Sequence, residues 1–303
     1  MSGYRDAALF LSLAAAWGAS FVAIKAGLSY FPPVLFAALR YDIAGVLMIA
    51  YAWYVLDDPV PRGRDQWAVV GVGAVLMIGA YHALLFIGEQ HTTSAAAAVI
   101  VSLSPVLTTG LARIALPESR LALPGLVGIL AGLFGVGLIA RPDPANLLAP
   151  TSVGVGLIFL ATAAFATGSV VTKRIDAGLP VETMEAWSML GGAVLMHACS
   201  RLIGESMADI VWTLEALLAI GYLAIVASAI GFLIYFALLD RLGPVEINLV
   251  SYVAPIVTAV VGWLLLGETI DALTLVGFLA IVVGFALIKR RALLDRLPVG
   301  HSG

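Results

Sequence analysis

Long apolar runs separated by short polar segments cover most of the chain. Stretches without Asp, Glu, Lys or Arg extend over residues 7–24, 66–88, 90–112, 121–140, 144–172, 216–239 and 247–267. A helix needs about 20 mostly apolar residues to cross a bilayer, so these runs predict seven membrane spans. Three further segments are shorter or contain charged residues: 33–55, 183–203 and 272–288. Together the two groups predict ten transmembrane helices.

These spans predict an all-α integral membrane protein. Helices satisfy their own backbone hydrogen bonds in lipid, and runs such as 157–166 lack the alternating polarity of a transmembrane β-strand. The composition agrees, because only 12% of the residues are charged and 61% are hydrophobic, whereas a soluble domain has roughly 25% charged residues. A single cysteine, Cys199, excludes an intrachain disulfide and a multi-cysteine metal site. We expect no metal, no cofactor and no cleaved signal peptide.

The positive charges predict the orientation of the spans. With the N-terminus inside, twelve of the 16 Lys and Arg residues fall in inner segments, Arg40 falls within a span, and Lys25, Arg141 and Arg201 fall at outer ends. Inner loops of membrane proteins are enriched in these residues. Both termini are therefore predicted to be cytoplasmic.

The second half of the chain looks like a displaced copy of the first. Pro105 is followed thirteen residues later by Glu118, and Pro255 is followed thirteen residues later by Glu268. The two pairs are displaced by 150 residues (255 − 105 = 150). Both glutamates end their apolar runs, and we expect them to mark helix ends at the surface.

A second pair of positions has nearly the same displacement. Trp17 precedes Lys25 by eight residues and Phe165 precedes Lys173 by eight, at an offset of 148 (165 − 17 = 148). We therefore predict two five-helix repeats, residues 1–145 and 146–303. An odd number of crossings inverts the second repeat, and inverted repeats are a common basis for alternating access.

Several motifs resemble the drug/metabolite transporter superfamily, specifically its EamA-type ten-helix branch. They are the Trp17-Gly18-Ala19-Ser20-Phe21 segment, the Pro33 to Arg40 opening of the second span, and the paired prolines followed by leucine-x-glutamate. The resemblance covers residues 7–290 and departs from the family at Phe165-Ala166, where the second repeat lacks the Trp-Gly pair. It implies a multi-pass transporter of the bacterial inner membrane that exports small metabolites, commonly amino acids. Within that branch the chain is similar to the YddG-type amino-acid exporters.

Aromatic and polar residues deep in the spans are the candidate substrate-binding residues. Aromatic walls suit the side chain of an amino acid, and polar atoms suit its ammonium and carboxylate groups. The candidates are Trp17, Tyr81, His82, Tyr235, Ser251 and Tyr252. His82 could titrate near neutral pH and gate transport, or it could make one fixed hydrogen bond between helices.

Two prolines and two charges complete the candidate residues. We predict that Pro105 and Pro255 lie inside helices, where each removes a backbone hydrogen bond and acts as a hinge, or else as a static kink. Arg40 and Asp42 are intramembrane charges, which mark a pathway or a structural hydrogen-bond network. Being two residues apart, they point to nearly opposite sides and cannot easily pair with each other. Asp42 needs a donor from another helix, or a proton.

The leading hypothesis is a carrier that exports neutral or aromatic amino acids and works as a monomer in the lipid bilayer. The alternative is a carrier for cations or several drugs that uses Asp42. An intramembrane enzyme is disfavoured, because the histidines are scattered at 82, 91, 197 and 301 and no Gly-x-Ser-x-Gly or His-x-x-Glu-His pattern is present. A static channel is disfavoured by the predicted inverted repeats. Nothing in the charge pattern suggests nucleic acid as a partner.

Overall fold

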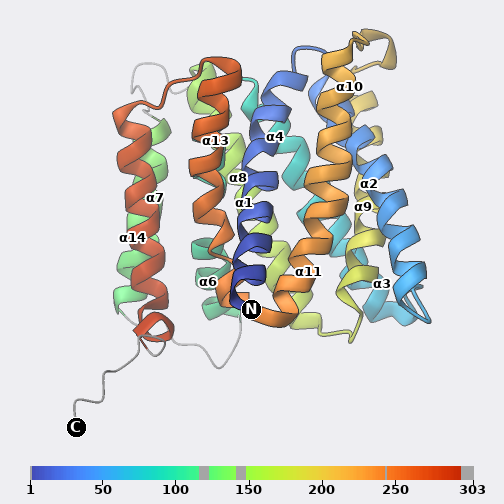
Figure 1. Ribbon diagram of the computed structural model, residues 1–303, viewed down its shortest axis with the longest axis horizontal. Helices are drawn as coiled ribbons and strands as arrows, with labels where there is room; N and C mark the ends of the chain where they lie inside the picture. The colour runs from blue at the N-terminus through green and yellow to red at the C-terminus, as the bar shows by residue number, and fades with distance from the viewer. Residues whose placement is uncertain (1, 116–122, 141–147, 243, 295–303) are drawn as a thin grey trace.

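The computed structural model of the protein describes residues 2–115, 123–140, 148–242 and 244–294, and this part of the chain is helical without strands (Figure 1). The elements before residue 148 are α1 (Ser2–Gly27), α2 (Pro33–Val55), α3 (Gly63–Val72), the π-helix η1 (Gly73–Ala80), α4 (Tyr81–Glu89), α5 (Ser94–Val101), α6 (Ser104–Ala115) and α7 (Leu123–Ala140). The elements after it are α8 (Pro150–Ile175), α9 (Val181–Leu202), the short 3₁₀ helix η2 (Met207–Asp209), α10 (Leu214–Gly221), the π-helix η3 (Tyr222–Ile230), α11 (Gly231–Leu242), α12 (Pro244–Ile247), α13 (Val250–Leu266) and α14 (Ala272–Leu294). The predicted all-α fold class is confirmed.

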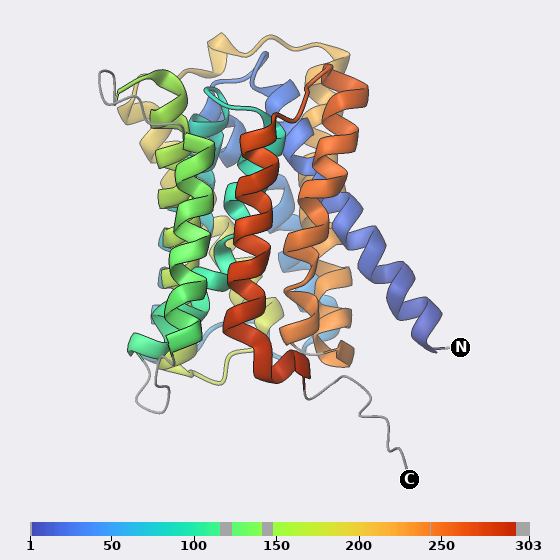
Figure 2. The ribbon, with the colours of Figure 1, turned by 90° about the vertical axis from the view of Figure 1, so that its left-hand side faces the viewer.

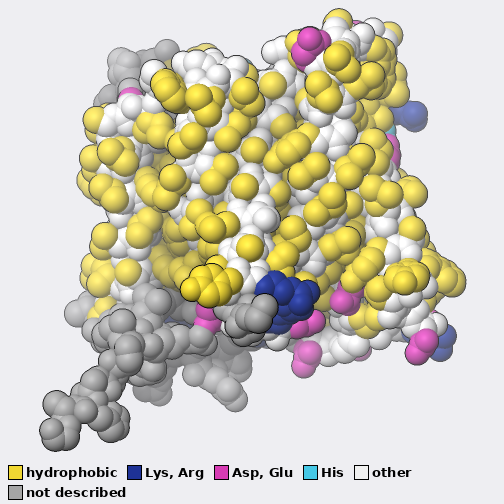
Figure 3. Space-filling view, in the orientation of Figure 1, with side chains coloured by type: hydrophobic (Ala, Val, Ile, Leu, Met, Phe, Trp, Pro, Cys, Tyr) yellow, Lys and Arg dark blue, Asp and Glu magenta, His cyan; other side chains and the backbone are white. Residues whose placement is uncertain are grey.

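Six helical stretches are long and apolar enough to cross a membrane. They are Tyr4–Gly27, Pro33–Val55, Gly63–Glu89, Ser94–Ala115, Pro150–Ile175 and Leu214–Leu242. Shorter apolar helices cover Pro124–Ala140, Val250–Leu266 and Ala272–Ile288. In the face shown in Figure 3, hydrophobic side chains cover the sides of the bundle and charged ones lie mostly at its two ends. This surface suits a lipid environment, while the exact number of spans stays a prediction.

Two π-helices interrupt two of the long stretches near their middle. η1 divides Gly63–Glu89, and η3 divides Leu214–Leu242. Their first residues are 149 positions apart (222 − 73 = 149), which agrees with the displacement of the predicted repeats. π-Helical segments are rare and occur frequently at functional sites, so both segments point to the middle of the bundle.

Both prolines lie in helices, but Pro105 does not lie in a helix interior as predicted. The chain ends α5 at Val101 and begins α6 at Ser104, so Pro105 lies in the first turn of α6. A proline needs no backbone N–H there, and its ring avoids the carbonyl four residues earlier. The helix is therefore interrupted between α5 and α6, where the sequence predicted a continuous helix with a kink at Pro105. Pro255 does lie inside a helix, α13, as predicted.

Close glycine contacts hold some of the helices together. Gly18 of α1 lies against the backbone of α13, where Thr258 Oγ1 donates to the Gly18 carbonyl at 2.8 Å. Gly128 of α7 faces Gly284 of α14 in the same way. α7 and α14 pack side by side at one edge of the bundle (Figures 1 and 2). Gly128 thus makes its close helix contact within the chain.

Candidate functional site

A cluster of buried and half-buried aromatic and polar side chains lies between the helices of both halves. We call it the central cluster. Its members are Trp17 (α1), Arg40 and Tyr41 (α2), Tyr81 and His82 (α4), Phe165 (α8), Ser228 (η3), and Phe232 and Tyr235 (α11). It therefore includes four of the six residues that the sequence nominated for substrate binding.

Arg40 reaches across the cluster to the second half of the chain. Its Nε donates to Ser228 Oγ at 3.0 Å, and its guanidinium carbon lies 5.1 Å from the centroid of the Tyr41 ring. A cation beside an aromatic ring is stabilised by the ring quadrupole. In the described part of the chain, no carboxylate forms an ion pair with Arg40.

His82 joins α2 to α4 through a short chain of hydrogen bonds. Its Nδ1 lies 3.0 Å from the Ile78 carbonyl, and its Nε2 lies 2.7 Å from the Tyr41 hydroxyl. A carbonyl oxygen only accepts, so Nδ1 carries the hydrogen and, in the neutral ring, Nε2 accepts from Tyr41. The histidine thus makes the fixed interhelical hydrogen bond that was one of its two predicted roles.

Trp17 and Phe165, which the predicted repeat relates, each pack against an aromatic residue of the other half. Trp17 Nε1 donates to the Ala227 carbonyl at 3.1 Å, and its ring centroid lies 5.6 Å from that of Tyr235. Tyr81 packs against Phe165, the residue that the predicted repeat aligns with Trp17, with centroids 5.4 Å apart. The cluster therefore contains two aromatic pairs, each of which joins the first half of the chain to the second.

The π-helices supply backbone groups to the same cluster. The Ile78 carbonyl belongs to η1, and the Ala227 carbonyl and Ser228 hydroxyl belong to η3. A π-bulge changes the regular backbone ladder, so these carbonyls can accept from side chains of neighbouring helices.

Two predicted binding residues lie elsewhere. Tyr252 packs against Phe285 of α14 with ring centroids 4.7 Å apart, and its buried hydroxyl has no hydrogen-bond partner among the described residues. Ser251 is half-buried, and its side chain forms no hydrogen bond with the described residues. The structure thus separates both from the contacts that connect Trp17, Tyr81, His82 and Tyr235.

Asp42 faces a different neighbour from Arg40. His197 of α9 supplies its partner, with Nε2 2.7 Å from Asp42 Oδ2. The Asp42 and His197 side chains are 44% and 33% exposed, and Ile43 and Val194 nearby are exposed apolar residues. The pair therefore borders the outside of the bundle. Its donor comes from another helix, as the position of Asp42 within a span requires.

The two lysines related by the predicted repeat have opposite surroundings. Lys25 Nζ donates to the carbonyls of Glu89, Gln90 and Thr92 at 2.8, 3.3 and 2.7 Å, which ties α1 to the α4–α5 turn. Lys173 forms no hydrogen bond with any residue that the structure describes.

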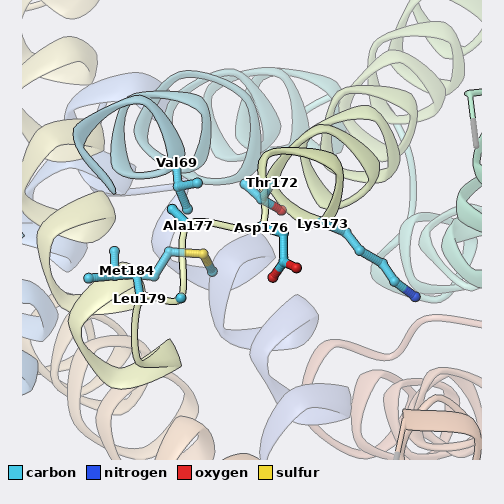
Figure 4. Close-up of a pocket in the computed structure, with 8 residues that line it drawn as sticks. Val69, Thr172, Lys173, Asp176, Ala177, Leu179 and Met184 are labelled. Atoms are coloured by element: carbon cyan, nitrogen blue, oxygen red, sulfur yellow. The ribbon is translucent and has the colours of Figure 1, made fainter. Parts of the chain in front are cut away.

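Lys173 instead lines a pocket of about 230 Å³ at the other end of the bundle. Asp176 and Met184 line the same pocket, and the Lys173 side chain runs away from both (Figure 4). Lys25 therefore links two helices at one end of the bundle through hydrogen bonds. Lys173, at the other end, makes no such contacts within the described chain.

Glu268 does more than mark a helix end. Its carboxylate accepts from the Ser94 backbone N–H at 3.1 Å and from the Ser94 hydroxyl at 2.6 Å. A carboxylate at a helix N-terminus satisfies otherwise unpaired N–H groups, so Glu268 caps α5. Its predicted counterpart, Glu118, lies outside the described residues.

Comparison with known proteins agrees with these features. The sequence profile of the EamA-like transporter family matches residues 6–141 and again residues 152–290. The chain is 29% identical to the uncharacterized inner membrane transporter YedA of Escherichia coli (strain K12), over 90% of this chain and 86% of that protein. It is 26% identical to the uncharacterized transporter YvbV of Bacillus subtilis (strain 168), over 95% of this chain and 92% of the relative.

A crystal structure has the same fold. It superimposes with a TM-score of 0.66 at 22% sequence identity, covering 97% of this chain and 99% of that one. At this level of identity the similarity concerns the fold alone.

Proposed function

Because the chain belongs to the EamA-like transporter family, we propose that this multi-pass membrane transporter exports neutral or aromatic amino acids across a bacterial inner membrane. The central cluster is the observation that carries the proposal. It joins the aromatic rings of Trp17, Tyr81 and Tyr235 to the hydrogen-bonding groups of Arg40 and Ser228. Apolar walls with a few polar groups are typical of sites for small organic ligands.

Alternating access is the mechanism that fits a site built from both halves. A carrier of this kind exposes its central site to one side at a time. The contrast between Lys25, held by three carbonyls, and Lys173, beside a pocket, supports such a difference between the two ends. Substrate would enter from the end that carries Lys173, which is the predicted cytoplasmic end. It would leave after the contacts of Lys25 open.

Flux into proteoliposomes tests this function. Purified protein is reconstituted, and entry of a panel of labelled amino acids is measured with and without a pH gradient. We expect saturable entry of several neutral or aromatic amino acids, competed by the unlabelled compounds. Absence of amino-acid flux together with gradient-driven flux of a lipophilic cation would replace the proposal with cation efflux, and Asp42→Asn would then be the next variant.

Two variants test whether the central cluster carries the flux. Trp17→Ala and Tyr81→Ala are expected to reduce transport without lowering the amount of folded protein. Trp53→Ala is the matched control, because Trp53 is 60% exposed near the end of α2. A similar loss of flux in the control would show that aromatic truncation acts through the membrane surface and would contradict the proposed site.

A further inference from the structure

Glu89, the last residue of α4, has a carboxyl group that is sealed inside the bundle. The residue is 0% exposed, and neither carboxyl oxygen has a hydrogen-bond partner in the described part of the chain. Glu205 and Glu268, by contrast, accept hydrogen bonds from backbone N–H groups. An ionised carboxylate without water or donors is far more costly to bury than a neutral carboxyl group. Glu89 therefore carries a proton in this conformation.

The ammonium group nearest in charge to Glu89 has no donor left for its side chain. Lys25 acts on Glu89 electrostatically, but no ion pair between the two side chains is present among the described residues. A lysine ammonium has three N–H donors, and Lys25 Nζ donates to the backbone carbonyls of Glu89, Gln90 and Thr92. These bonds join α1 to the α4–α5 turn at what we call the Lys25 end of the bundle. While they last, Lys25 cannot also donate to the Glu89 carboxyl group.

The other charged groups around α4 supply no direct partner to Glu89 either. Besides Lys25, the charged and titratable side chains on α4 and on its surroundings are Glu268 after α13, Arg40 and Tyr41 of α2, His91 in the α4–α5 turn, and Tyr81 and His82 of α4 itself. η1 and α5 have none, and α8 has only Lys173 and Arg174 near its C-terminal end. Glu268 opposes a second negative charge nearby, whereas Arg40 favours it without forming an ion pair among the described residues.

Loss of the proton from Glu89 is not compatible with the closed contacts of the Lys25 end. The O–H bond breaks, the proton passes to water, and the carboxylate that remains needs a donor or a hydration shell. Lys25 can provide a donor only by releasing one of its carbonyls. Water can reach the carboxylate only if the α4–α5 turn moves away from α1. Both responses weaken the contacts that hold this end closed.

We propose that Glu89 is a proton-binding site that controls opening at the Lys25 end, where the closed form holds the proton and the open form releases it. This inference rests on the alternating access of the proposed function, but not on the identity of the substrate. Since the closed form binds one proton more than the open form, the ratio of open to closed molecules rises with pH. For one proton the rise is up to about tenfold per pH unit.

Distances between two spin labels across the Lys25 end test the proposal. Cys199, the one cysteine of the chain, is replaced by serine, and labels are attached to Ser29→Cys after α1 and His91→Cys in the α4–α5 turn. Both positions are exposed, and the second substitution also removes a titratable group. Distance distributions are recorded on the full chain in lipid nanodiscs between about pH 5 and pH 9, the range in which most proteins stay folded. We expect a short distance at low pH and a longer one whose population grows with pH; a distribution that does not change with pH would overturn the proposal.

Variants of the labelled protein assign the proton to Glu89. Glu89→Gln keeps the shape of the protonated side chain but cannot ionise, so it should show the short distance at every pH. Glu185→Gln is the matched control, because Glu185 is a glutamate of α9 that is also buried, at 7% exposed, and this variant should keep the pH dependence. A pH dependence that survives in Glu89→Gln, or one that is lost equally in Glu185→Gln, would contradict the assignment.

A further variant covers a failure of Glu89→Gln to fold. Glu89→Asp keeps an ionisable carboxyl group on a shorter side chain, and it should shift the pH at which the longer distance appears. An unchanged midpoint would show that another group binds the proton.

The outcomes separate the role of Glu89 from the proposed function. Amino-acid flux into proteoliposomes together with label distances that do not change with pH would overturn the role of Glu89 and leave amino-acid export standing. Opening that depends on pH and on Glu89, in a protein without amino-acid flux, would support the proton site and overturn the proposed substrate.

Discussion

Replacing Gly18 with alanine tests whether close backbone contact holds α1 against α13. An added Cβ would lie 2.6 Å from the Ala254 carbonyl oxygen and 2.7 Å from Val257 Cβ. Since real Cβ contacts essentially never fall under 3.0 Å, the helices must separate by at least 0.4 Å (3.0 − 2.6 = 0.4). The same movement strains the hydrogen bond from Thr258 to the Gly18 carbonyl, which is now 2.8 Å long.

The loss of stability expected for Gly18→Ala can be estimated by comparison with Gly71→Ala. Gly71 in α3 has no atom within 4 Å of an added Cβ, so Gly71→Ala gains helix propensity, about 1 kcal/mol, without a clash. Gly18→Ala gains the same helix propensity, but overpacking lowers its free energy of unfolding by about 1–3 kcal/mol. The propensity term cancels between the two variants, so Gly18→Ala should be less stable than Gly71→Ala by about 1–3 kcal/mol. Lipid provides no hydrophobic force between helices, which leaves little to compensate the lost contact.

Equilibrium unfolding of both variants in bicelles, titrated with a denaturing detergent, measures this difference. Tryptophan fluorescence can follow the transition, since the chain has 6 tryptophans. A Gly18→Ala variant as stable as Gly71→Ala would refute the reasoning, because α1 and α13 would then not depend on their close approach.

Three further predictions concern polar contacts at other places. In a double-mutant cycle, Asp42→Asn and His197→Ala should show a coupling of about 1 kcal/mol in thermal unfolding, since the pair is half-exposed; additive effects would contradict the pair. Glu205→Ala removes both acceptors for the first N–H groups of α2 and should lower the free energy of unfolding by about 0.5–2 kcal/mol; Glu205→Gln, which keeps one acceptor, should lose less. Lys25→Met should speed hydrogen exchange in the α4–α5 turn, because three carbonyls lose their donor, and equal exchange in Lys25→Met and the control Lys173→Met would count against this role.

The sequence was sufficient to predict the spans because lipid imposes a strict demand on length and polarity. The predicted segment 33–55 coincides with α2 (Pro33–Val55) despite its two charges. Hydropathy reports the environment of a whole segment and not its local backbone. It therefore could not show that α5 ends before Pro105, nor that two π-helices lie at mid-span.

The central cluster was predictable only in part. Deep aromatic residues such as Trp17 and Tyr81 are unusual enough to be noticed singly. Ser228, by contrast, is one small polar residue in a long apolar run, and its contact with Arg40 joins residues 188 positions apart. A contact across such a separation depends on how helices pack, and a single sequence without detectable covariation contains no direct sign of it.

The glycine contacts between α7 and α14 have a consequence for biosynthesis. Gly128 and Gly284 are 156 positions apart (284 − 128 = 156), and a ribosome adds about 5–20 residues per second. About 8–30 s therefore pass between synthesis of Gly128 in α7 and synthesis of Gly284 in α14. Throughout that interval a nascent chain presents a groove that the small-residue face of another helix could occupy. The first half of the chain thus obtains its last neighbour only when the final helix leaves the ribosome.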